Sequence, residues 1–189
     1  LGKVSMNKHH YEVLIVGAGI SGCALAYELA RYTDITKIAI VEKYGSIASL
    51  NSKGTANSQT IHVGDIETNY TLSKAAITKR TAKMVEKYAL QHGYQNSIIF
   101  SHQKMALGIG EAEVEFLLHR YEEFSELFPY LEVWDKEKLK TLEPRVVFDE
   151  MGNERPEPIV GIGATGQWTT VDYGKMAESF ITNAQNEPN

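Results

Sequence analysis

The feature that most constrains this sequence is a glycine-rich turn set between two short apolar segments. Residues 11–16 are apolar and β-branched, which predicts a buried strand, and Gly17-Ala-Gly-Ile-Ser-Gly22 follows at once. Residues 23–32 are good helix formers, with Leu25 and Leu29 on one face. A second buried strand is expected at 37–42. The order strand, turn, helix, strand predicts one right-handed βαβ unit.

The spacing of the glycines predicts a dinucleotide site at this turn. Gly17 allows the tight turn, Gly19 leaves room for a diphosphate against the backbone, and Gly22 lets the helix pack close to the strand. Backbone N–H groups and the positive end of the helix bind the diphosphate. Glu42, about twenty residues after Gly22, is expected to accept hydrogen bonds from the adenosine ribose. The alternative is a plain tight turn with Glu42 at a solvated strand end.

The segment after Glu42 decides which dinucleotide is expected. Glu42 argues against NADP, because its charge would meet the 2′-phosphate. An NAD-binding half would soon supply another helix and strand. Residues 43–69 instead are rich in Ser, Asn, Gly, Thr and Gln without periodicity, and long loops of this kind are often functional. The short polar side chains of 51–64 suit the edge of a flavin ring, so FAD is predicted; the alternative is a disordered surface loop.

The rest of the chain mixes helices and strands without regular alternation. Helices are expected at 71–92, 111–128 and 172–184, and strands at 98–100, 105–107, 146–148, 159–161 and 167–170. The predicted fold class is therefore α/β: a Rossmann-like FAD-binding domain with a βαβ start and a parallel sheet, plus part of an inserted α+β substrate domain. The predicted domains are 8–94 for the N-terminal part of the FAD-binding domain, 95–170 for a partial substrate domain, and 171–189 for a helix that returns to the FAD-binding domain.

Composition excludes several other classes. The net charge of −5, from 19 Lys and Arg against 24 Asp and Glu, makes nucleic acid a poor partner. Cys23 is the single cysteine, which rules out an internal disulfide and a multi-cysteine zinc site, and the histidines show no metal-ligand spacing. No apolar run approaches the roughly 20 residues of a membrane span. Residues 1–5 are interpreted as a scar or mis-started leader, with Met6 as the true start.

Several motifs together carry a family resemblance. Gly17-Ala-Gly-Ile-Ser-Gly22, Glu42-Lys43 and Asn57-Ser-Gln-Thr-Ile-His62 resemble the FAD-dependent 2-hydroxyacid dehydrogenases, and most of all the malate:quinone oxidoreductases. His62, Glu67 and Asn69-Tyr70-Thr71 match residues after that family's flavin loop. The likeness extends over nearly all of 8–184 through three further motifs: Gln103-Lys-Met-Ala-Leu-Gly108, Leu142-Glu-Pro144 and Thr169-Thr-Val-Asp-Tyr173.

The resemblance implies a chemistry and a set of partners. FAD would take a hydride from C2 of (S)-malate to give oxaloacetate, and the electrons would pass to a membrane quinone. The implied location is the cytoplasm, with or without peripheral attachment to the inner face of the cell membrane. Family members continue well beyond Asn189, so the resemblance implies an N-terminal fragment whose substrate pocket is mostly absent. The alternatives are an FAD enzyme for 2-hydroxyglutarate or glycerol 3-phosphate, or a non-catalytic nucleotide-binding module.

Individual residues receive roles on these grounds. His62 is the candidate catalytic base, or a neighbour of the flavin; the alternative is a hydrogen-bonded loop histidine. Lys53 and Lys104 either contact a carboxylate or the flavin, or are solvated, and Cys23 is expected to be a small packing residue. The expected cofactor-binding residues are Gly17, Ala18, Gly19, Ile20, Ser21, Gly22, Glu42, Lys43, Ser52, Asn57, Ser58, Gln59, Thr60 and Ile61.

Overall fold

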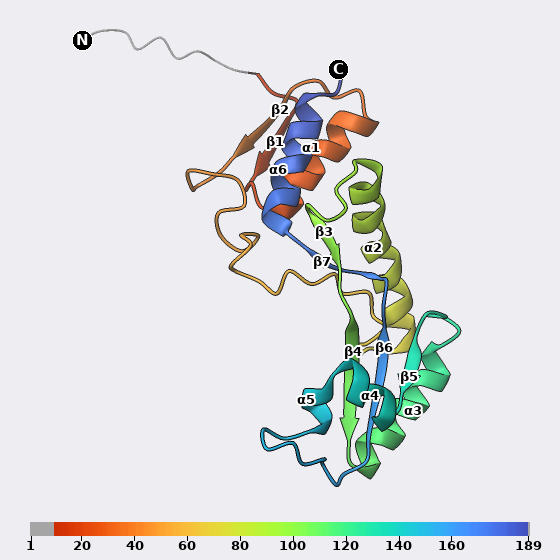
Figure 1. The fold of residues 1–189 in the computed structure, drawn as a ribbon. Coiled ribbons are helices and arrows are strands. Elements are labelled where there is room, and N and C mark those ends of the chain that lie inside the picture. The colour runs from red at the N-terminus through yellow and green to blue at the C-terminus, as the bar shows by residue number, and fades with distance from the viewer. Residues whose placement is uncertain (1–9, 189) are drawn as a thin grey trace, which may run out of the picture. The chain divides into compact units, whose positions relative to one another are not determined.

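The computed structural model describes residues 10–188, so the proposed start at Met6 lies outside the described residues. The chain divides into two compact units (Figure 1). The first unit holds the described residues up to Gln59 together with those from Val171 onward, and the second holds Thr60–Thr170. The predicted boundary after residue 94 differs from the unit boundary after Gln59. The assignment of 8–94 and 95–170 to cofactor and substrate domains remains a prediction.

The first unit contains the predicted βαβ arrangement. Strand β1 (Val13–Val16) pairs in parallel with β2 (Ile38–Val41), with Val13 opposite Ile38 and Val16 opposite Val41. Helix α1 (Ile20–Tyr32) connects the two strands and buries Cys23, Ala26 and Tyr27. The parallel pair and its crossover helix confirm the α/β start predicted from the sequence.

Helix α6 (Tyr173–Gln185) completes the first unit from the far end of the chain. It lies beside α1 (Figure 1), and the rings of Tyr27 and Phe180 approach to 5.6 Å between centroids. The Asp172 side chain caps the helix by accepting a hydrogen bond from the Lys175 backbone N–H. The helix predicted at 172–184 is thus present.

Two glycines of the turn are required by the backbone itself. Gly17 has a φ of +100°, a conformation that side chains disfavour. A Cβ on Gly22 would lie 2.0 Å from the Gly17 carbonyl oxygen. The first turn of α1 therefore reaches its place against the end of β1 only because residue 22 has no side chain.

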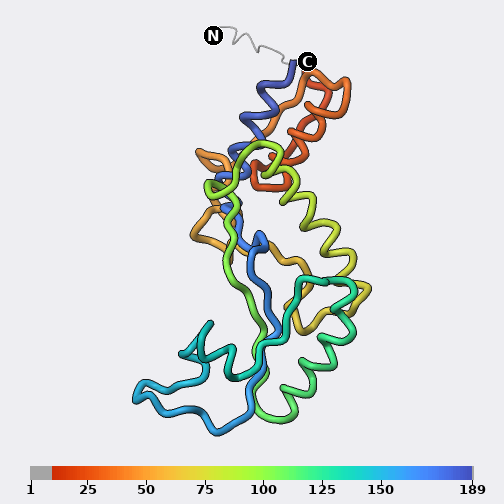
Figure 2. The backbone as a smooth tube through the Cα atoms, turned by 45° about the vertical axis from the view of Figure 1, so that its right-hand side comes forward, coloured from red at the N-terminus to blue at the C-terminus, as the bar shows by residue number. Residues whose placement is uncertain are grey.

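The loop between β2 and α2 (Leu72–Gln91) has no regular structure, as the sequence predicts. Figure 2 follows its backbone from β2 to α2. Residues 42–71 contain no helix and no strand, only an isolated bridge from Thr60 to Thr170. Helix α2 begins at the predicted place because the Thr71 hydroxyl accepts a hydrogen bond from the Lys74 N–H. It ends before Gly93, which has a φ of +71°.

The second unit is built on an antiparallel sheet, covered by helix α3 (Glu111–Phe124). Strand β6 (Ile159–Ala164) is central, between β4 (Lys104–Ile109) and β5 (Glu132–Trp134). A smaller pair joins β3 (Ile99–Ser101) to β7 (Trp168–Val171). Trp134 is fully buried, and its ring lies where a Cβ on Gly163 would be, 2.3 Å from two ring carbons.

Three details of the second unit differ from the sequence expectations. The sequence predicts a strand at 146–148, but Val146 and Val147 belong to helix α5 (Pro144–Val147), because Pro144 favours the first turn of a helix. Phe148 alone forms an isolated β-bridge, with Glu154. Helix α4 (Lys136–Leu142), capped by the Asp135 side chain, and strand β5 were not foreseen. Helix α3 ends at Phe124, short of the expected residue 128.

No helix within residues 10–188 combines the length and apolar character that a membrane crossing requires.

We predict that Gly22→Ala destabilises the fold while Gly45→Ala does not. The new methyl group at position 22 meets a backbone carbonyl, and overpacking of this kind costs about 1–3 kcal/mol or more. A Cβ at Gly45 meets nothing within 4 Å, which makes it the matched control. Urea denaturation followed by circular dichroism measures both. Equal midpoints for the two variants would contradict the proposed packing constraint.

Candidate functional site

The glycine turn of the first unit presents backbone donors that already hold oxygen atoms. The Ala18 N–H donates to Glu42 Oε2 at 2.6 Å, and the Ile20 N–H donates to Ser52 Oγ at 3.0 Å. The Gly17 N–H donates to the Val41 carbonyl at 2.8 Å, which ties the turn to β2. Donors that bind a carboxylate and a hydroxyl oxygen at a helix N-terminus also suit the oxygens of a diphosphate.

Gly19 differs from the other two glycines of the turn. Its φ is −75°, and a Cβ there would meet only Ser52 Oγ, at 3.4 Å. The fold therefore does not require a glycine at position 19. A glycine here leaves room for a group from outside the protein to approach the backbone closely, as the second glycine of a dinucleotide-binding turn does.

Glu42 stands between two clefts of the first unit. One has a volume of about 190 Å³ and extends from Gly19 to Ser52; the other has a volume of about 580 Å³ and is lined largely by aliphatic residues of β2, α1 and α6. Hydrogen bonds from the Ala18 and Tyr44 N–H groups lower the pKa of the Glu42 carboxyl. The Glu42 carboxylate is therefore held by two backbone N–H groups beside both clefts.

Other predicted cofactor residues organise the loop. The Asn57 side chain donates to the Asn51 carbonyl at 2.8 Å and accepts from the Gln59 N–H at 2.8 Å. The Gln59 side chain accepts from the Tyr173 N–H at the start of α6. Lys43 is exposed, with its ammonium 5.5 Å from the Tyr44 ring centroid. In the second unit Ile61 is buried, and its N–H donates to the Thr169 carbonyl.

The structure adds residues to this site that the sequence analysis did not name. Tyr44, Ala48, Ser49, Leu50 and Asn51 line the smaller cleft. Ala48 has a φ of +52°, and its N–H donates to the Ala18 carbonyl at 2.9 Å, so this loop segment is bonded to the glycine turn. The cleft lining and the Ala48–Ala18 hydrogen bond could not be predicted, because this segment of the sequence has no periodicity.

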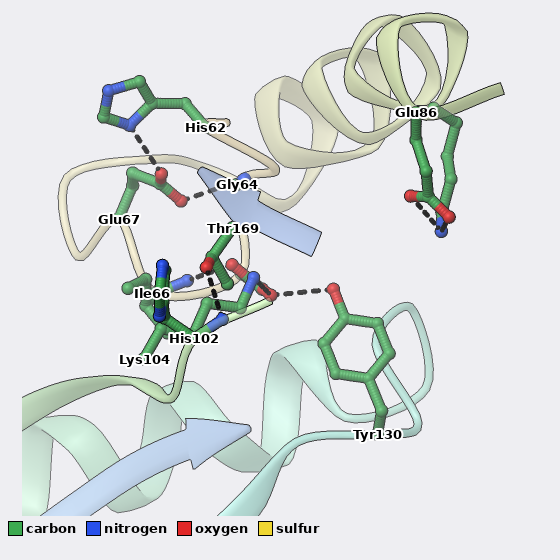
Figure 3. A network of polar contacts seen from close by, with 11 residues as sticks. His62, Gly64, Ile66, Glu67, Glu86, His102, Lys104, Tyr130 and Thr169 are labelled. Carbon is green, nitrogen blue, oxygen red and sulfur yellow. Dashed lines mark hydrogen bonds and ion pairs between the residues drawn. The ribbon is translucent and has the colours of Figure 1, made fainter. Parts of the chain in front are cut away.

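In the second unit, His62 is paired with Glu67 (Figure 3). His62 Nδ1 lies 2.9 Å from Glu67 Oε1, and the Gly64 N–H donates to Glu67 Oε2 at 2.9 Å. The His62 side chain is 56% exposed and that of Glu67 only 16%. The candidate base is therefore held by a carboxylate on one side while the rest of its ring is accessible.

A buried ionic cluster lies under this pair. Asp65 is 2% exposed, forms an ion pair with Lys104 of β4 and accepts a hydrogen bond from the Tyr130 hydroxyl at 2.7 Å. The Lys104 side chain is 9% exposed, so it contacts a carboxylate of the protein and is not solvated. Burial, and then the neighbouring Asp65 carboxylate, raise the pKa of Tyr130.

Arg120 of α3 holds the same loop from another side. Its guanidinium donates to the Glu67 carbonyl at 2.6 Å and to the Tyr70 carbonyl at 3.1 Å, and it lies 3.8 Å from the Phe124 ring centroid. Arg120 is 6% exposed, and this burial lowers its pKa. Sequence reasoning missed Arg120 because it stands in a helix whose other charges are typical of a solvated face.

Cys23 packs in the interior of the first unit. The Cys23 Sγ lies 3.4 Å from the Ala18 carbonyl oxygen, and burial raises the pKa of the thiol to about 11. The thiol is therefore protonated near neutral pH, and Cys23 is a small packing residue, as expected.

Among residues 10–188 no group of three or more His, Cys, Asp or Glu side chains is arranged to hold a metal ion.

The glycine turn, the parallel strand pair and the acidic residue at the end of β2 define a dinucleotide-binding protein of the Rossmann type. The chain belongs to the FAD dependent oxidoreductase family, whose model matches residues 12–187. Membership confirms the predicted fold class, the enzyme class and FAD as the cofactor of the family.

Relatives confirm the predicted resemblance. A Campylobacter jejuni protein named probable malate:quinone oxidoreductase is 56% identical over 96% of this chain. A Helicobacter pylori malate:quinone oxidoreductase is 45% identical over 92%. The chain spans about two-fifths of their length, 41% and 39% respectively. The structure of a reduced L-α-glycerophosphate oxidase from Mycoplasma pneumoniae with FAD bound matches 95% of this chain and 44% of its own, with a TM-score of 0.71 and 25% identity.

We predict that Lys104→Met destabilises the second unit more than removal of the whole cluster. The single change leaves the Asp65 carboxylate buried without its cation, which costs about 3–5 kcal/mol. The combined variant Asp65→Leu, Lys104→Met and Tyr130→Phe leaves no charge or hydroxyl unpaired there, so part of the stability should return. Urea denaturation compares the two. A single variant as stable as wild type would show that Asp65 does not depend on Lys104.

Proposed function

We propose that this chain forms the FAD-binding part of an enzyme that oxidises (S)-malate to oxaloacetate and passes the electrons to a quinone. The observation that carries the cofactor is the bare backbone at Gly19 beside the Ala18 and Ile20 donors. The observation that carries the substrate is the likeness, over 96% of the chain, to a relative named for malate and quinone. Quinone as acceptor goes with a peripheral position at the membrane.

The first-unit residues have proposed roles in holding the cofactor. The Ala18 and Ile20 N–H groups would bind the diphosphate, with the Glu42 carboxylate and the Ser52 hydroxyl both changing partner. Glu42 would then accept from the ribose hydroxyls. FAD, when bound, supplies the acceptor for the hydride. The wider proposed set in this unit is Gly17, Ala18, Gly19, Ile20, Ser21, Gly22, Glu42, Lys43, Ser52, Asn57, Ser58 and Gln59.

His62 is the proposed general base. Its exposed imidazole can accept the proton of the substrate hydroxyl as the hydride leaves C2. The domain roles go with this proposal: 8–94 and 171–189 serve the cofactor, and 95–170 serve the substrate.

A second candidate substrate is glycerol 3-phosphate. A Mycoplasma pneumoniae protein named glycerol 3-phosphate oxidase is 32% identical over 83% of this chain. The relatives named for malate are more similar to this chain, and on this ground we rank malate before glycerol 3-phosphate.

We predict that Gly19→Val abolishes flavin binding without unfolding the chain. The new side chain fills the space over the Ala18 and Ile20 donors, while the backbone at position 19 tolerates a Cβ. Flavin absorbance of the purified protein measures binding, thermal melting measures the fold, and Glu86→Gln on α2 is the control. Undiminished flavin content in a folded Gly19→Val variant would remove this turn from the cofactor site.

We predict that the full-length enzyme reduces a dye with (S)-malate at least about tenfold faster than with 2-hydroxyglutarate or glycerol 3-phosphate. Steady-state kcat/KM for the three substrates, with a quinone analogue as second acceptor, gives the comparison. A preference for glycerol 3-phosphate would transfer the assignment to the second candidate, and no turnover with any of them would contradict both.

A further inference from the structure

We propose that Glu67 is a positioning residue that fixes the tautomer of His62. It keeps the proton on Nδ1 and leaves Nε2 as the atom that accepts a proton. The catalytic use of this arrangement rests on the proposed function, in which His62 is the base. The arrangement itself rests on contacts within the second unit alone.

The pairing decides where the imidazole proton resides. Glu67 Oε1 lies 2.9 Å from His62 Nδ1, on the edge of the ring that faces the carboxylate in Figure 3. An ionised carboxylate has no proton to give, so the hydrogen bond requires the proton on Nδ1. In the neutral ring the lone pair is then on Nε2, which lies on the side away from Glu67.

Glu67 itself is held at both its side chain and its backbone. Its second carboxylate oxygen accepts the Gly64 N–H at 2.9 Å, and its carbonyl accepts from the buried Arg120 guanidinium at 2.6 Å. Gly64 has a φ of +97°, and a Cβ there would lie 2.8 Å from Ala75 Cα, so this turn is pressed against α2. The carboxylate therefore has little freedom to rotate away from His62.

The cluster around Asp65 anchors the segment that connects the two partners. Asp65 lies between His62 and Glu67 in sequence, and its ion pair with Lys104 and hydrogen bond from Tyr130 fasten it to the core of the second unit. The loop is thus bonded to β4, to α3 and to the segment after α3. Two buried cations, Lys104 and Arg120, therefore hold this loop in place.

The arrangement suits oxidation of an alcohol. The C–H bond at C2 breaks and its electron pair leaves as hydride to the flavin of the proposed function. The hydroxyl O–H bond breaks as its proton passes to His62 Nε2, and the C=O bond forms. The imidazolium then carries a positive charge next to the Glu67 carboxylate, which stabilises it.

The test compares Glu67→Gln with Glu86→Gln in the full-length, flavin-loaded enzyme. A glutamine at 67 can accept from Nδ1 through its oxygen, but its amide can also donate, so the Nε2–H tautomer becomes populated. Glu86 forms an ion pair with Lys83, three residues earlier on α2, and serves as the control. We expect kcat to fall between about tenfold and 10⁴-fold for Glu67→Gln, with KM and flavin content near wild type. Glu86→Gln should match wild type.

A second readout reports the tautomer without activity. Nitrogen-15 NMR of histidine-labelled protein, assigned with His62→Gln, should show His62 with protonated Nδ1 and unprotonated Nε2 in wild type at alkaline pH. Glu67→Gln should give a mixture. Glu67→Asp, which keeps a carboxylate on a shorter chain, should restore the wild-type pattern in part.

The outcomes separate the two levels of the claim. An unchanged His62 tautomer in Glu67→Gln overturns the proposal. A loss of kcat in strict proportion to the loss of bound flavin also overturns it, because Glu67 would then only hold the loop in its folded conformation. If wild type does not oxidise malate, or if His62→Gln keeps full activity, the proposed function or its base fails. The NMR result then still decides whether Glu67 positions His62.

Discussion

The contact between the first turn of α1 and the end of β1 sets the geometry of the first unit. A side chain at Gly22 would overlap the Gly17 carbonyl, so the helix starts as close to the strand as two backbones allow. This contact brings the Ala18 and Ile20 N–H groups to the end of the parallel sheet, where Glu42 and the 48–52 segment meet them. The candidate anion site is a consequence of backbone packing rather than of any charged side chain.

In the second unit, side chains from the sheet and from α3 hold the irregular loop from His62 to Tyr70 in one conformation. Buried cations do this: Lys104 neutralises Asp65, and Arg120 binds two loop carbonyls. Removing water from such charges costs free energy unless every partner is in place. These contacts fix the His62–Glu67 pair on an otherwise polar, aperiodic segment. Supporting contacts of this kind are needed wherever a side chain must be held in one orientation.

Local signals made much of this fold predictable. The strands flanking the glycine turn and the helices near 71–92 and 172–184 follow from patterns that extend over a few residues. Val146 and Phe148 are residue types typical of strands, and they predict a strand at 146–148. Residues 144–147 form helix α5 instead, because Pro144 favours the start of a helix and Val147 packs in the core. Arg120 binds the Glu67 and Tyr70 carbonyls and Lys104 pairs with Asp65, and because these partners are far away in sequence, no spacing rule identifies them.

We propose that the turn after β1 binds the diphosphate of FAD. Titration of flavin-free full-length protein with FAD, in the presence and absence of ADP, tests it most directly. We expect saturable quenching of flavin fluorescence that ADP weakens by competition, because both ligands would use the same backbone donors. Quenching that ADP leaves unchanged, or no quenching at all, would contradict it.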